Sequence, residues 1–141
     1  MTAAPATATA AVFTWLGMVA AISFLEAPLK FRAPGVTVRI GLGIGRLVFR
    51  ALNTAEVILA GVLVVAAVSD PPPPRVAATG AAAVAALAVQ LIVVRPRLAR
   101  RSARVLAGED VPRSSGHYVY VVLELLKVAA LLTTGVMLLA R

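Results

Sequence analysis

Four long apolar stretches fill most of this 141-residue chain, and charged side chains lie well inside at least three of them. Hydrophobic residues make up 60% of the chain and charged residues only 14%, and the mean hydropathy is +0.93. Soluble domains of this size do not have such a composition. Because a helix needs about 20 residues to cross the hydrocarbon of a bilayer, four spans use up the chain and leave no separate soluble domain.

The sequence therefore predicts an all-α fold, an integral membrane four-helix bundle that forms one domain over residues 1–141. The helices are expected at about residues 8–29, 42–68, 76–95 and 117–140. Asp70 and the prolines at 71–74 cannot continue a helix, so the second and third helices should be antiparallel neighbours joined by a tight turn. The other two connections, at about 30–41 and 96–116, are longer.

Basic residues crowd these two longer connections, which predicts the orientation of the chain. They are Lys30, Arg32 and Arg39 in one, and Arg97, Arg100, Arg101, Arg104 and Arg113 in the other, whereas only Arg75 and Arg141 fall on the opposite side. Since Lys and Arg near span ends stay on the cytoplasmic face, both termini should be extracytoplasmic in a multi-pass protein of the plasma membrane. The expected partners of the basic residues are anionic headgroups and not nucleic acid, despite the net charge of +8.

Other sequence features narrow the chemistry. The chain has no cysteine and a single histidine, which argues against disulfides, thiolate metal sites and nitrogen-rich metal sites, so neither a metal nor a cofactor is expected. The first span lacks a basic leader and a cleavage motif, and we expect it to stay attached. The arginines from Arg97 to Arg104 recur at helical spacing, so the third helix should run on through the membrane interface.

Polar residues inside the spans are the candidate ligand-binding or ion-binding residues, because such groups are costly in a bilayer and usually functional. On the first span Trp15, Ser23, Glu26 and Lys30 share a face, and Glu26 lies one turn before Lys30, which favours an internal pair. The candidates are Glu26, Arg46, Arg50, Asn53, Glu56, Gln90, His117, Glu124 and Lys127. No catalytic residue is assigned.

Helical spacing predicts which of these residues meet. Glu56 lies about 15 Å beyond Arg46 along the second helix, and Lys127 lies equally far beyond His117 on the fourth. If Arg46 and His117 mark the same interface, Glu56 and Lys127 have equal depth and should pair. The same comparison pairs Glu124 with Arg50 and brings Glu26 to Arg46 or Arg50.

Two interpretations of these charges stay open. Four basic residues (Lys30, Arg46, Arg50, Lys127) stand against three acidic ones (Glu26, Glu56, Glu124), and such near balance is typical of a structural salt-bridge network. The number and variety of the polar groups favour instead a hydrated, cytoplasm-facing cavity among Asn53, Glu56 and Glu124.

Small residues indicate close helix packing. Gly41 and Gly45 form a Gly-x-x-x-Gly step, and the third span is rich in alanine with Gly80, so backbones can approach closely within the bundle or between two protomers. A homodimer through these faces is one expectation, and contact with another membrane protein is an alternative.

Several short motifs resemble the family of small four-helix membrane proteins typified by transmembrane protein 205. They are Trp15-Leu16-Gly17, Ala27-Pro28-Leu29-Lys30-Phe31, Gly45-Arg46 with Phe49, Pro96-Arg97-Leu98, and His117 at the start of the fourth span. The resemblance implies a four-helix integral membrane protein of largely unassigned activity. Glu26, Glu56, Glu124 and Lys127 make this chain richer in charge than the family pattern.

Three functions follow from these observations. The first is binding or transport of a small ion or polar solute at the charged intramembrane site, with Glu56 and Glu124 as proton or cation sites. The second is a structural or accessory subunit, which requires the charged stripes to face outward. The third is a lipid-modifying enzyme using His117 and Glu124, but these lie about 10 Å apart along one helix, too far for direct cooperation.

Overall fold

The computed structural model describes residues 1–110 and 116–141, and every regular element in them is helical. Four continuous helical stretches are long and apolar enough to cross a membrane: Ala3–Arg32, Val38–Ser69, Pro74–Leu106 and Gly116–Leu139. The expectation of an all-helical fold with four helices long enough to cross a membrane is confirmed. The first two stretches begin about four or five residues earlier than expected. In the first stretch, apolar alanines extend the helix toward the N-terminus, and Pro5 is tolerated because it lies in the first turn.

The first stretch consists of α1 (Ala3–Val19), the π-helix η1 (Ala20–Glu26), α2 (Ala27–Leu29) and the 3-10 turn η2 (Lys30–Arg32). The second is the single helix α3 (Val38–Ser69). The side-chain oxygen of Thr37, the residue before it, accepts a hydrogen bond from the Ile40 amide at 3.2 Å. This is an ordinary N-cap. Gly35, with a φ of +81°, makes the turn between the two stretches.

The third stretch consists of α4 (Pro74–Val89), the π-helix η3 (Gln90–Val94) and α5 (Arg95–Leu106), and the fourth is α6 (Gly116–Leu139). The expected continuation of the third helix through its arginines is confirmed by α5. Arg113 lies outside the described residues.

Each π-helix ends two residues before a proline. The amide of Ala27, before Pro28, donates to the carbonyl of Ile22, and the amide of Arg95, before Pro96, donates to the carbonyl of Gln90. Each bond spans five residues, which is the π-helical spacing. Proline crowds the carbonyl four residues earlier, so a wider turn relieves that contact. The local loosening expected at Pro28 is confirmed, and Pro96 repeats it.

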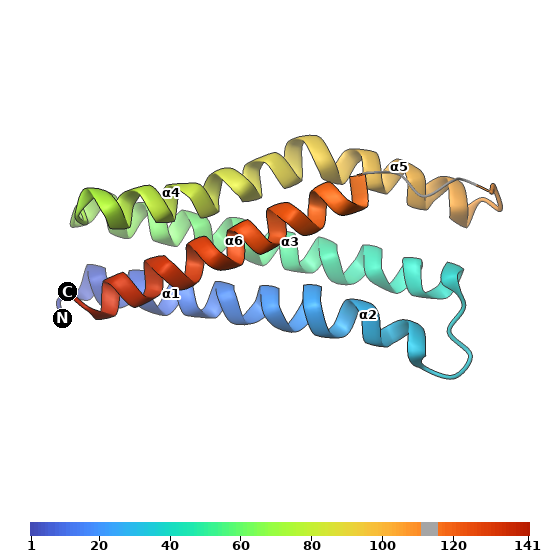
Figure 1. The fold of residues 1–141 in the computed structure, drawn as a ribbon, viewed down its shortest axis with the longest axis horizontal. Helices are drawn as coiled ribbons and strands as arrows, with labels where there is room; N and C mark the ends of the chain where they lie inside the picture. Colours follow the sequence, from blue (N-terminus) through green and yellow to red (C-terminus); the bar gives the residue numbers. More distant parts are fainter. Residues whose placement is uncertain (111–115) are drawn as a thin grey trace.

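Both termini and the turn between α3 and α4 lie at one end of the bundle, which we call the terminal end (Figure 1). The opposite end, with residues 33–37 and the end of α5, is called the basic end. α1 packs along both α3 and α6, and α6 also packs along α4. The expectation that α3 and α4 are close neighbours holds at their turn, but their contact is slight elsewhere, because α1 and α6 fill the centre of the bundle.

Glycines allow some of these close approaches. A Cβ on Gly41 would meet the ring of Phe31, one on Gly45 would lie 3.0 Å from Lys30 Nζ, and one on Gly135 would lie 2.7 Å from the ring of Phe13. The space beside Gly41 and Gly45 is therefore filled by side chains of the same chain. The sequence alone allowed these glycines to pack either within the bundle or against a second protomer.

Candidate functional site

A buried polar cluster lies at the middle of the bundle, with one residue from each span at its core. Trp15, Glu56, Gln90 and Lys127 each lie within three residues of the midpoint of their helical stretch. These four residues are at most 1% exposed, as is Glu124. These groups therefore share one level, near the middle of the four helical stretches that are long and apolar enough to cross a membrane.

Lys127 is the centre of the cluster. Its ammonium group lies 2.5 Å from Glu56 Oε2 and 2.6 Å from Glu124 Oε1, and it donates to Gln90 Oε1 at 2.8 Å. These contacts use all three donors of a lysine. One ammonium thus joins α3, α6 and the start of η3.

Further donors hold the two carboxylates. The indole of Trp15 donates to Glu56 Oε2 at 2.7 Å, and the hydroxyl of Ser23 donates to Glu124 Oε2 at 2.8 Å. The amide of Gln90 donates to Glu124 Oε1 at 3.3 Å. Glu56 Oε1 is buried and has no hydrogen-bond partner within the described part of the chain. It is the one carboxylate oxygen of the cluster left without a donor there.

Aromatic and basic side chains form a layer between the cluster and the basic end. Phe49 and Tyr120 contact each other edge to face, with ring centroids 6.1 Å apart. The Arg95 guanidinium lies 5.1 Å from the Phe49 centroid and 5.8 Å from that of Tyr120, and Lys30 Nζ lies 5.6 Å from Phe49. These are cation–π distances. Lys30 also pairs with Glu26 at 3.7 Å, as the sequence predicts.

Apolar side chains close the opposite side of the cluster. Leu131, one turn beyond Lys127 on α6, is fully buried, and Val12 and Leu63 pack in the same core. The Thr134 hydroxyl lies within hydrogen-bond distance of the Thr79 hydroxyl and of the Ala130 carbonyl, so it is satisfied locally. The site is therefore asymmetric, with polar groups toward the basic end and a hydrocarbon seal toward the terminal end.

Of the predicted pairs, Glu56 with Lys127 is confirmed. The pairing of Glu124 with Arg50 is wrong, because Glu124 contacts Lys127, Gln90 and Ser23 instead. The approach of Glu26 to Arg46 or Arg50 is also wrong, since Glu26 pairs with Lys30. The physical reason is the rotation of α3.

The inward face of α3 carries Gly41, Leu52 and Glu56, which are buried, and Phe49 faces inward at the depth of the two arginines. Arg46 and Arg50 are exposed on the outside. The expectation that Asn53 shares a cavity with Glu56 and Glu124 is also wrong, because the rotation of α3 turns Asn53 away from them. Asn53 lines a shallow outer groove with Arg50, Thr54, Val57, Ile58 and Leu91.

His117 lies at the first turn of α6, exposed, with its ring 5.8 Å from that of Tyr118. It lies two turns from the buried Glu124 and makes no contact with it that could support acid–base chemistry.

Several residues of the site were not among the sequence candidates. Trp15 and Ser23 lie on the polar face of the first span, and Tyr120 lies on that of the fourth. Their place on these faces is the sequence signal that could have identified them as site residues. Arg95 was expected only as the last residue of the third span, and Phe49 entered the sequence analysis only as part of a family-like motif.

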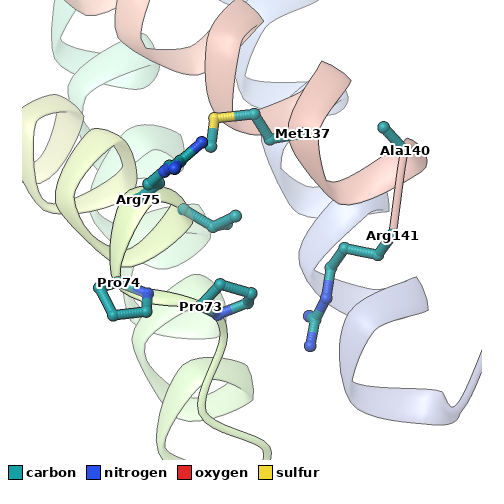
Figure 2. Close-up of a pocket in the computed structure, with 7 residues that line it drawn as sticks. Pro73, Pro74, Arg75, Met137, Ala140 and Arg141 are labelled. Carbon is teal, nitrogen blue, oxygen red and sulfur yellow. The ribbon is translucent and has the colours of Figure 1, made fainter.

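A shallow pocket lies at the terminal end, between the start of α4 and the end of α6 (Figure 2). Its lining is Pro73, Pro74, Arg75, Val76, Met137, Ala140 and Arg141. Arg75 and Arg141 border the opening, but its area is mainly apolar and it lies far from the buried cluster.

Comparison of the chain with protein-family models, with curated proteins and with solved structures found no match. The fold and the buried site define the class of this protein. It is an all-helical protein with four helices able to span a membrane, as expected of a multi-pass membrane protein.

Proposed function

We propose that this protein binds a proton at the carboxylate pair Glu56 and Glu124, near the middle of the membrane. The observation that carries this proposal is the charge count of the cluster. Two fully buried carboxylates share one ammonium group, that of Lys127. If all three groups are ionised, the cluster has one negative charge in excess.

An excess charge in this environment is expensive. Moving an ion into a low-dielectric interior costs several kcal/mol even after relaxation, and a charged side chain at the bilayer centre costs at least about 2.5–3.5 kcal/mol. One added positive charge removes the excess and leaves a neutral cluster.

A proton fits this need better than a metal ion. Among the residues that the structure describes, no group of three or more His, Cys, Asp or Glu side chains could hold a metal. Three of the four carboxylate oxygens already accept hydrogen bonds from protein donors. A proton needs only the remaining oxygen, Glu56 Oε1.

Access from the basic end follows one face of the first span. Glu26, which is partly exposed, lies one turn from Ser23, and Ser23 donates to Glu124. Glu124 and Glu56 are both bonded to Lys127, so titratable and hydroxyl groups lead from the basic end to the cluster. Leu131, Val12 and Leu63 seal the other side. Release toward the terminal end, which transport requires, would need these apolar side chains to separate.

The proposal includes an orientation and a location. We place the basic end in the cytoplasm and both termini outside the plasma membrane, because arginines are concentrated at the basic end. Arg97, Arg100 and Arg104 of α5 then lie at the level of anionic headgroups. Membership in the transmembrane protein 205-like family remains part of this proposal and rests on the short motifs alone.

The alternative function, a structural or accessory membrane subunit, is supported by residues outside the central cluster. Arg46 and Arg50 face outward, as an accessory subunit would require, but the central cluster does not. The enzyme alternative loses its acid–base pair, because His117 and Glu124 are separated.

Infrared spectroscopy tests the proton directly. The chain has only six Asp and Glu residues, so each carboxyl band can be assigned by one substitution. At neutral pH the protein in lipid should show the C=O stretch of a protonated carboxylic acid, and Glu56→Gln should remove it. Glu109→Gln is the matched control, because Glu109 is exposed and paired with Arg104.

Two results would contradict the proposal. If only ionised carboxylate bands appear at neutral pH, the cluster carries its negative charge or holds another cation. If the acid band survives in both Glu56→Gln and Glu124→Gln, the proton lies elsewhere in the chain.

A further inference from the structure

The outward stripe of α3 is a polar feature that the proposed proton site does not use. Arg46, Arg50 and Thr54 follow one another at four-residue spacing, and all three are exposed. Arg50 and Asn53 begin a groove that continues over Thr54, Val57 and Ile58 of α3 and Leu91 of η3. Within the described residues neither arginine has an ion-pair partner.

We propose that this groove binds one anionic glycerophospholipid, with its phosphate at Arg50 and Arg46 and an acyl chain along Val57, Ile58 and Leu91. Two arginines without a counter-charge inside an apolar helix supply the charge complementarity. Arginine suits phosphate oxygens because its planar guanidinium donates two parallel hydrogen bonds.

The depth of Arg50 agrees with a headgroup partner. Arg50 lies six residues before Glu56, which is about 9 Å along the helix axis, and half of the hydrocarbon thickness is about 15 Å. Side chains on a helix point toward its N-terminus, and the N-terminus of α3 is at the basic end. An extended arginine therefore covers the remaining few ångströms.

The polar and apolar residues of the groove follow the same order along its length as the groups of a lipid. Arg50 and Asn53 are its members nearest the basic end, and Val57 and Ile58 lie one to two turns deeper. The Thr54 hydroxyl donates to the Arg50 carbonyl at 2.9 Å, so it is occupied by its own helix. The order from basic to polar to apolar follows a glycerophospholipid from its phosphate to its acyl chain.

A second copy of the chain fits this face less well. In a two-fold interface the same patch meets itself, so arginines 46 and 50 of one protomer would approach those of the other. Like charges in contact oppose such a dimer, whereas an anionic lipid neutralises them.

Native mass spectrometry of the detergent-solubilised protein tests the proposal. The probes are phosphatidylglycerol and phosphatidylcholine with identical acyl chains. We expect one phosphatidylglycerol to bind more tightly than phosphatidylcholine, and Arg50→Gln to weaken that binding about tenfold or more, because a charge-assisted hydrogen bond is lost. Leu91→Trp, which fills the apolar part without changing the charge, should weaken both lipids.

Arg39→Gln is the matched control, since it removes the same charge from the exposed first turn of α3, outside the groove. Equal weakening by Arg39→Gln and Arg50→Gln would overturn the proposal in favour of unspecific attraction. Equal binding of both lipids would overturn the role of the arginines. A dimer that disappears in Arg50→Gln would show that a second copy occupies the groove.

Discussion

The residue that decides the chemistry of this protein is Lys127. Its ammonium group is fully buried and contacts Glu56, Glu124 and Gln90. Without it, two carboxylates would face each other without a counter-charge. A lysine at this position therefore makes it possible for both acids to be buried in the same place.

The charge count predicts that substitutions of Lys127 and Glu56 have unequal effects on the stability of the protein. Lys127→Met should destabilise the protein by about 3–5 kcal/mol, as when one partner of a buried pair is removed. Glu56→Gln should cost less than about 1 kcal/mol, because glutamine resembles the protonated acid and leaves Glu124 and Lys127 as a neutral pair. Thermal unfolding in detergent measures both.

The double variant completes this comparison. Its cost should be smaller than the sum of the single costs, since removing Glu56 also removes one of the carboxylates exposed by the loss of Lys127. Additive effects, or a larger effect of Glu56→Gln than of Lys127→Met, would contradict the assigned charge state.

For single residues, the sequence predicts the depth of a side chain along its helix well, but it predicts poorly which face of the helix turns inward. Counting residues along two helices gives Glu56 and Lys127 equal depth, and they do meet. The same count places Arg50 level with Glu124, but depth does not say which face of α3 turns inward. Phe49 occupies the inward position, and it carries no charge that would mark it in the sequence.

Among the elements, the π-helices η1 and η3 explain how the site is built. Ser23 lies within η1 and Gln90 begins η3, so the two uncharged donors to Glu124 come from widened turns before a proline. Pro28 made the first widening predictable. The second was obscured because Pro96 was taken as part of a connection, although α5 continues the same helix.

Contacts between helices predict a contrast between two glycines. Gly135→Ala should destabilise the protein by about 1–3 kcal/mol, because the added methyl overlaps the Phe13 ring between α1 and α6. Gly17→Ala should be neutral or stabilising by up to about 1 kcal/mol, since nothing lies within 4 Å of its added Cβ and alanine favours helix. Unfolding of both variants in the same detergent checks this, and similar effects would contradict the packing of α1 on α6.

For the whole molecule, the distribution of charge separates two surfaces with different tasks. The central cluster is enclosed by all four spans, while Arg46 and Arg50 of α3 and Arg97, Arg100 and Arg104 of α5 are exposed. Hydropathy predicts four helices, and basic residues predict their orientation. The division between inner and outer charge depends on helix rotation, which tertiary packing fixes.

The orientation can be measured with single cysteines, since the natural chain has none. Ala33→Cys and Ala107→Cys probe the basic end, and Thr2→Cys and Ala140→Cys probe the terminal end, all at exposed positions. In intact cells a membrane-impermeant maleimide should label positions 2 and 140 and reach positions 33 and 107 only after permeabilisation, because the concentration of arginines at the basic end favours its retention in the cytoplasm. The reverse pattern would invert the orientation and place the open side of the proton site outside the cell. Labelling of all four positions in intact cells would contradict a membrane-spanning bundle.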